Sequence, residues 1–152
     1  MSLYIGCDPG KSGAIAVITT DENKEPIRVR VVPFDEVTYC DILSTCTGSR
    51  VVCCLEKVGA MPGQGVVSMF NFGHNLGYIE GLLQAHKIPY QLVPPQTWKK
   101  EFSLIGKDKQ SSVEVCKKLF PHISLLATSR SRKEHDGMAE ALLMAEYCRR
   151  KL

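Results

Sequence analysis

Residues 4–15 read YIGCDPGKSGAI, and this stretch decides how the chain begins to fold. An apolar run ends in Asp8, and a turn with one proline and two glycines leads into a second apolar run at 14–20. Proline and glycine at this density predict a chain reversal, so we expect two neighbouring strands joined by a tight turn. An acid at the end of a buried strand is unusual, and Asp8 is therefore the first candidate functional residue.

The remaining pattern predicts an α/β fold with a mixed five-stranded sheet flanked by helices. Residues 27–34 alternate in polarity as the third strand of an antiparallel meander, and the apolar run at 50–56 is typical of a strand covered on both faces. A fifth strand, at 88–93, completes a parallel pair with the fourth. Helices are expected at 35–48, 66–86, 94–102, 107–120 and 135–150. No repeat or long linker divides the 152 residues, so we expect a single domain over 1–152.

The composition is that of an ordinary globular protein, with 44% hydrophobic and 23% charged residues. No apolar run approaches the ~18 residues of a membrane span, and the first residues lack the charged and apolar regions of a secretory signal. We therefore expect no membrane association and a cytoplasmic location. The seven cysteines include no CxxC pair, and Cys53 and Cys54 lie inside an apolar run, so reduced core thiols are expected.

Charge is distributed unevenly along the chain. Residues 1–98 contain 7 basic and 9 acidic side chains, whereas residues 99–152 contain 12 basic and 7 acidic ones. A basic last third fits a polyanionic partner such as nucleic acid. Solvated helix faces would give the same count, so the charge pattern alone leaves both interpretations open.

A second acid, Glu56, ends the strand expected at 50–56, as Asp8 ends the first strand. If these strands are parallel neighbours, both carboxylates emerge side by side at the edge of the sheet where α/β proteins bind ligands. Two close carboxylates resist ionising together unless a cation lies between them. Oxygen ligands of this kind suit Mg²⁺ or Mn²⁺, so the sequence predicts a metal site there.

The segment KEHDGMAEALLMAEY supplies further acids. Asp136 lies near the start of the last expected helix and Glu140 lies four residues on, so both can face the strand acids. The alternate face, which includes Met138 and Leu142, would pack on the sheet. Taken alone, each acid has another interpretation: Asp136 could cap the helix, Glu140 could be a solvated or ion-paired residue, and Asp8 could be part of the turn.

Four segments occur in one order and together span nearly the full chain: IGCDPGKSGAIAVI at 5–18, CLEKV at 54–58, VPPQTWKKEF and GKDKQSSV within 93–113, and HDGMAEALLMAEY at 135–147. Their order and spacing resemble the RuvC-type Holliday junction resolvases of the RNase H-like nuclease superfamily, in particular phage or bacterial variants. The resemblance implies an RNase H-like fold, a homodimer, and Mg²⁺-dependent paired nicking of four-way DNA junctions that leaves 5′-phosphate and 3′-hydroxyl ends. It also implies the cytoplasm of a bacterial or phage-infected cell and no nucleotide cofactor.

By position, the resemblance makes Asp8, Glu56 and Asp136 the ligands of two Mg²⁺ ions per active site, with Mn²⁺ as an alternative. Lys99 and Lys109 correspond to lysines of the family that approach the scissile phosphate. The other basic residues of the last third are expected to follow the DNA backbone; they are Lys100, Lys107, Arg130, Arg132 and Lys133.

The chain departs from the family at the fourth acidic position. The family carries an acid or histidine three residues before the helix acid, whereas this chain has Lys133 three residues before Asp136. His135, Glu134 or Glu140 could fill the fourth role. The helical face favours Glu140.

A second departure follows the second acid, where the family has an aromatic residue that stacks on a junction base. This chain has VGAMPGQG at 58–65, in which Met61 is the nearest bulky residue. Met61 could insert as a wedge between bases, or the segment could be a flexible loop without that role. Trp98 is expected to pack beneath its helix rather than to stack on a base.

The helix expected at 66–86 is the candidate homodimer interface, because it is apolar around more of its circumference than a one-sided helix needs. Gly73, Gly77 and Gly81 recur at a spacing of four and would let another helix approach closely. Packing against the protein's own sheet is the alternative, and both can hold on different faces.

Three other functions compete with junction resolution. An endonuclease of the same fold could act more broadly on flaps and Y-forks. A fragment of an actin-like phosphotransferase would share the acidic strand and turn, but that class needs two lobes. A non-catalytic junction-binding protein would not need all three core acids.

Overall fold

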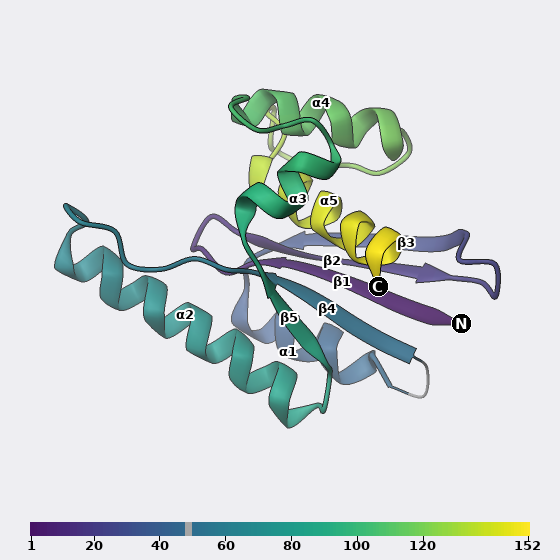
Figure 1. Ribbon diagram of the computed structural model, residues 1–152, viewed down its shortest axis with the longest axis horizontal. Helices are drawn as coiled ribbons and strands as arrows, with labels where there is room; N and C mark the ends of the chain where they lie inside the picture. The colour runs from purple at the N-terminus through teal and green to yellow at the C-terminus, as the bar shows by residue number, and fades with distance from the viewer. Residues whose placement is uncertain (48–49) are drawn as a thin grey trace.

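The computed structural model describes residues 1–47 and 50–152 and shows a five-stranded sheet in the order β3-β2-β1-β4-β5 (Figure 1). The strands are β1 (Ser2–Asp8), β2 (Ala14–Thr20), β3 (Pro26–Pro33), β4 (Arg50–Glu56) and β5 (Tyr90–Val93). β1, β2 and β3 form antiparallel pairs, whereas β4 pairs in parallel with both β1 and β5. The predicted mixed sheet is confirmed.

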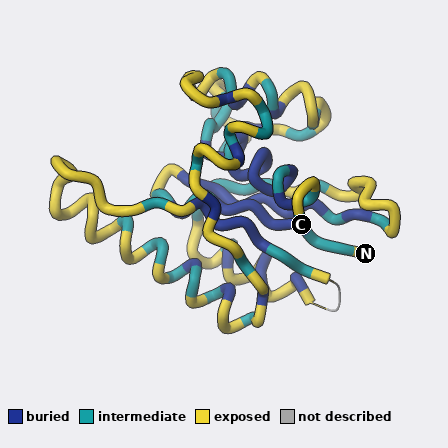
Figure 2. Tube along the Cα trace, viewed as in Figure 1, coloured by how far each residue is buried: buried dark blue, intermediate teal, exposed yellow. Residues whose placement is uncertain are grey.

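Helices cover both faces of this sheet (Figure 1). On one face lie α1 (Glu36–Thr45) and α2 (Val66–Ala85), and on the other lie α3 (Pro95–Glu101), α4 (Lys109–Leu119) and α5 (Asp136–Lys151). A side chain at Gly6 would collide with the backbone of Ala141, so glycine at this position lets α5 rest directly on β1. Figure 2 shows the central strands and α5 as the buried interior, while α2 exposes much of its length.

Most predicted boundaries differ from the observed ones by one to three residues, and two of them are informative. The helix expected at 35–48 ends at Thr45, and its expected end at residue 48 lies outside the described residues. β5 begins at Tyr90 instead of residue 88, because Pro89 has no N–H to donate to a strand ladder. The Pro89 carbonyl instead accepts a hydrogen bond from Cys53 N at 2.9 Å.

The core has one layer on each face of the sheet. The packing face predicted for α5 is confirmed, since Met138, Ala141, Leu142 and Ala145 are all buried. The seven cysteines are free thiols; six are buried as expected, but Cys40 is exposed because it lies on the outer side of α1. Among the helices that the structure describes, none combines the length and apolar character that a membrane span requires.

Candidate active site

The ends of β1 and β4 bring two acids to the same edge of the sheet. The parallel register pairs Cys7 with Leu55, so the next residues, Asp8 and Glu56, leave the two strands side by side. Glu56 is only 8% exposed. This burial raises the pKa of Glu56, and the charge of Asp8 raises it further. Burial also raises the pKa of Asp8. The structure therefore brings the two strand acids together, as expected from their positions.

The start of α5 adds a third acid. His135 is the N-cap residue, because its Nδ1 accepts a hydrogen bond from a backbone N–H of the first turn at 3.0 Å. The interpretation of Asp136 as the cap is therefore wrong, and Asp136 is the first residue of the helix. A side chain at Gly137 would collide with the carbonyl of Ser12, so glycine lets the helix start rest on the turn that follows Asp8.

Lys109 forms an ion pair with this third acid. Asp108 caps α4 by accepting the Ser111 N–H at 2.9 Å, so the helix begins at Lys109 instead of the predicted residue 107. Lys109 Nζ lies 3.1 Å from Asp136 Oδ2. Burial is the largest single influence and acts to raise the pKa of Asp136, but the hydrogen bond and charge of Lys109, together with a backbone hydrogen bond, outweigh it, and the pKa lies below its usual value.

Glu140 lies one helical turn beyond Asp136 and is influenced by both strand acids. Burial, and then the charges of Asp8 and Glu56, raises the pKa of Glu140 to about 7. The ammonium groups of two nearby lysines, Lys99 and Lys109, act in the opposite direction. We call Asp8, Glu56, Asp136 and Glu140 the acid edge.

The two other candidates for the fourth acidic position are engaged elsewhere. Glu134 Oε1 lies 2.7 Å from Lys117 Nζ on α4. The Nδ1 atom of His135 serves as the cap of α5. Glu140 is the candidate whose carboxyl group responds to the charges of the strand acids.

Helix α3 places two residues, Trp98 and Lys99, next to the acid edge. The side chain of Trp98 is fully buried, which confirms that it packs in the interior. Its Nε1 also donates a hydrogen bond to Glu56 Oε2 at 2.8 Å, a contact that the sequence analysis missed. The available signal was the tryptophan itself, since a buried indole N–H usually finds an acceptor. Lys99 Nζ lies 5.6 Å from the centroid of the Trp98 ring.

Three of the predicted DNA-contacting lysines lie close to these residues in the chain. Lys133 lines a small hollow together with Lys109 and Asp136. Lys100 follows Lys99 on α3 and is exposed, as is Lys107 in the loop before α4. Of the three, Lys133 is thus the one whose contact with the surroundings of Asp136 is seen directly.

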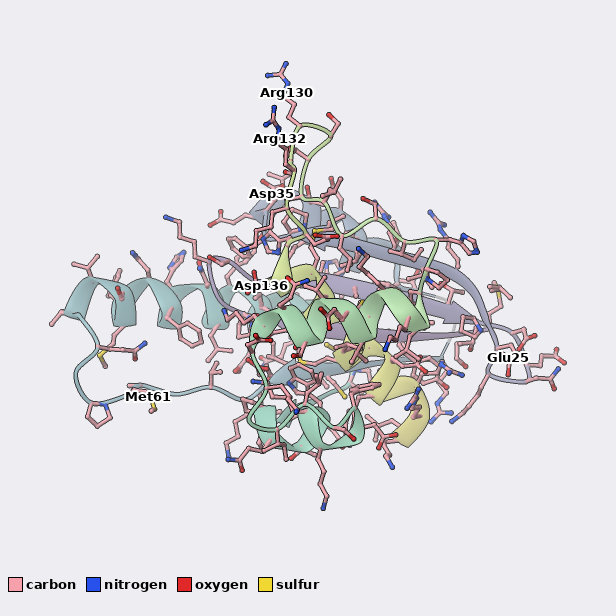
Figure 3. The ribbon with its side chains drawn as sticks, turned by 90° about the horizontal axis from the view of Figure 1, so that it is seen from above. Glu25, Asp35, Met61, Arg130, Arg132 and Asp136 are labelled. Atoms are coloured by element: carbon pink, nitrogen blue, oxygen red, sulfur yellow. The ribbon has the colours of Figure 1, made fainter. Side chains whose placement is uncertain are left out.

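Three other predicted DNA-contacting residues lie farther out. Figure 3 shows Arg130 and Arg132 pointing away from the body of the protein, on the segment between α4 and α5. Met61 is 65% exposed and lies in the segment that precedes α2, away from Asp136 (Figure 3). The structure therefore does not bring these three residues to the acid edge.

The donor set of the acid edge fits a divalent cation such as Mg²⁺. Carboxylate oxygens are the ligands that Mg²⁺ prefers, and the charge of Asp8 adds to burial in raising the pKa of Glu56. Within residues 1–47 and 50–152, no three His, Cys, Asp or Glu side chains already converge as metal ligands. The Oδ2 atom of Asp136 is held by Lys109. A cation that binds Asp136 through this oxygen would have to replace the lysine.

The strand order and helix layers define an RNase H-like α/β fold. The fold is similar to that of T. thermophilus RuvC in complex with a Holliday junction substrate, with a TM-score of 0.62 and 12% identity, covering 94% of this chain and 90% of that one. A second Thermus thermophilus RuvC structure gives a TM-score of 0.59 and 14% identity, with the same coverage. No protein-family model and no curated protein matches the chain. The RNase H-like fold that the resemblance implies is thus confirmed.

Proposed function

We propose that this protein is a Mg²⁺-dependent endonuclease that resolves four-way DNA junctions by paired symmetric nicks. The observation that supports it best is the acid edge, which gathers carboxyl groups from β1, β4 and α5. The fold that carries the acid edge is similar to that of a RuvC structure in complex with a Holliday junction substrate. We propose that one nuclease domain spans residues 1–152.

Asp8, Glu56 and Asp136 would hold two Mg²⁺ ions, or Mn²⁺, which when bound supply water activation and stabilisation of the leaving 3′ oxygen. Glu140 would complete the acid edge as the fourth acidic residue. Lys99 and Lys109 would place positive charge against the phosphate as negative charge develops on it. The products would carry 5′-phosphate and 3′-hydroxyl ends.

Exposed basic residues would hold the DNA arms through their phosphates. Such contacts give affinity that falls with salt and carries little sequence preference. The residues proposed for this role are Lys100, Lys107, Arg130, Arg132 and Lys133. Met61, exposed ahead of α2, would insert between bases of the junction.

A homodimer would present two acid edges to the two opposed strands of a junction. Helix α2 supports this proposal, because Val67 and Phe70 expose apolar side chains in its first half. A Cβ atom added at Gly73, Gly77 or Gly81 would meet open space. A second helix could therefore approach α2 closely along this stripe.

The decisive experiment incubates the protein with Mg²⁺ and labelled four-way, three-way, flap and linear duplex DNA. We expect symmetric paired nicks in the four-way junction, and none after Asp8→Asn or Glu56→Gln. Junction binding in EDTA should survive both changes, because the basic residues are separate from the acid edge. Comparable cutting of flaps and Y-forks would instead indicate a broader branched-DNA endonuclease, and comparable cutting of linear duplex would contradict junction resolution.

A further inference from the structure

Trp98 is the single tryptophan of the chain and forms a buried polar contact with the acid edge. Trp98 is 0% exposed and Glu56 is 8% exposed. The Nε1 atom of Trp98 lies 2.8 Å from Glu56 Oε2. An indole N–H bonded to a carboxylate is a charge-assisted hydrogen bond, stronger than one between neutral groups. The contact is therefore a fixed feature of the interior.

The backbone brings α3 to Glu56 through a short connection. Glu56 is paired with Val93 in the parallel register of β4 and β5, and the Val93 carbonyl accepts the Lys57 N–H at 2.7 Å. Pro94 and Pro95 then end the strand and begin α3, with Pro95 at the first helical position. One helical turn after Pro95, Trp98 therefore lies next to Glu56, the partner of Val93 at the end of β5.

The chemistry of this contact differs from that between Lys109 and Asp136. Lys109 brings a positive charge to its carboxylate, whereas the indole N–H is a neutral donor that cannot accept or release a proton in this range. Trp98 can thus hold Glu56 in place without cancelling its charge. Among the described residues, Trp98 is the side chain that donates a hydrogen bond to Glu56, and it does so at Oε2, which leaves Oε1 without a protein donor.

We infer that Trp98 is a positioning residue, whose indole N–H fixes Glu56 Oε2 so that the charged carboxylate presents its other oxygen to a divalent cation. This inference rests on the proposed function, because the cation belongs to it. Partners that orient a metal ligand from behind typically change metal affinity 10- to 100-fold when they are removed. Trp98 is therefore expected to set the affinity of the acid edge for metal.

The test compares Mn²⁺ binding to the full chain by isothermal titration and by electron paramagnetic resonance. Trp98→Phe keeps an apolar ring but removes the N–H, and we expect it to weaken Mn²⁺ binding about tenfold or more. The matched control is Phe102→Leu, which loses aromatic packing against the same core cluster and leaves the indole in place. This control should bind Mn²⁺ with wild-type affinity.

A second measurement uses the unaltered protein and does not depend on how well Trp98→Phe folds. Because Trp98 is the single tryptophan, its indole ¹H–¹⁵N resonance and its fluorescence can be assigned without ambiguity. We expect the resonance to shift on adding Mg²⁺, the fluorescence to be quenched saturably by Mn²⁺, and both responses to be lost in Glu56→Gln.

The outcomes separate this inference from the proposed function. Wild-type Mn²⁺ affinity in a folded Trp98→Phe protein, or an indole resonance unchanged by both Mg²⁺ and Glu56→Gln, would overturn the positioning role while leaving metal-dependent cleavage intact. Failure of the wild-type protein to bind Mn²⁺ saturably would overturn both. The inference is supported if Trp98→Phe binds Mn²⁺ more weakly than the wild type while Phe102→Leu binds it with wild-type affinity.

Discussion

The two long helices α5 and α2 lie on opposite faces of one sheet and are buried to very different degrees (Figure 1). Ten of the 16 residues of α5 are buried, against two of the 20 residues of α2, and both helices lie wholly within the described residues. α5 carries Asp136 and Glu140, so its burial fixes these acids relative to β1 and β4. α2 leaves an apolar surface open to contact. One helix thus holds the proposed chemistry in place, and the other is available for association.

The largest expected effect comes from removing a core side chain on α5. Leu142→Ala should lower the free energy of unfolding by about 3 kcal/mol, because Leu142 is fully buried and its loss leaves a cavity. The matched change on α2, Phe70→Ala, should alter it by less than about 0.5 kcal/mol, since Phe70 is 75% exposed. Urea denaturation at low protein concentration measures both. Equal losses would show that the two helices do not differ in this way.

Next in size is the contrast between two helical glycines. Gly137→Ala should destabilise the protein by about 2 kcal/mol and slow cleavage, because the new methyl group meets the Ser12 carbonyl and displaces the start of α5. Gly77→Ala meets open space and should stabilise α2 by up to about 1 kcal/mol through helix propensity. Thermal unfolding distinguishes the two signs. A change of the same sign at both positions would contradict the packing described for Gly137.

Glu140→Gln should stabilise the metal-free protein in a pH-dependent way. Because the pKa of Glu140 is raised from 4.5 to about 7 in the folded protein, its ionisation opposes folding as the pH rises through this window. The variant should therefore gain about 1 kcal/mol at pH 8, below the roughly 3 kcal/mol that the full shift would give for a wholly buried group, and nothing near pH 4. Melting curves in EDTA at the two pH values provide the measurement. A gain that is the same at both would exclude an origin in the charge of Glu140.

The smallest effect on folding is expected on the outer side of α2. Val67→Ser should leave the free energy of unfolding of the monomer within about 0.5 kcal/mol of the wild type but weaken dimerisation. Ile27→Ser on β3 is the control, since Ile27 is also an exposed apolar residue but lies outside α2. Sedimentation equilibrium reports the association of each. If both variants self-associate as the wild type does, α2 is not the interface.

The positions of the strand acids and the helix acids could be predicted from the sequence. Asp8 and Glu56 each follow an apolar run, and parallel strands end at the same edge of a sheet. The spacing of Asp136 and Glu140 places them on one face of any helix that contains both. These inferences use only the local sequence patterns and the rule that parallel strands end at the same edge of a sheet. They do not depend on how the side chains pack.

The partners of these acids could not be predicted in the same way. The bond from Trp98 to Glu56 and the pair of Lys109 with Asp136 depend on how α3 and α4 pack above the sheet, which residue periodicity does not encode. The cap of α5 was missed for a different reason. Asp and Ser are the usual N-cap residues, so Asp136 was the expected choice and the ring nitrogen of His135 was not.

The pair of Lys109 and Asp136 has a consequence for how metal and DNA would act on each other. If a divalent ion took the place of Lys109 at Asp136, it would release one ammonium group beside the acid edge. A released ammonium is free to meet a phosphate. Metal would then tighten DNA binding, and by thermodynamic reciprocity DNA would tighten metal binding by the same factor. Through Lys109 alone, the binding of metal and the binding of DNA would thus become positively cooperative.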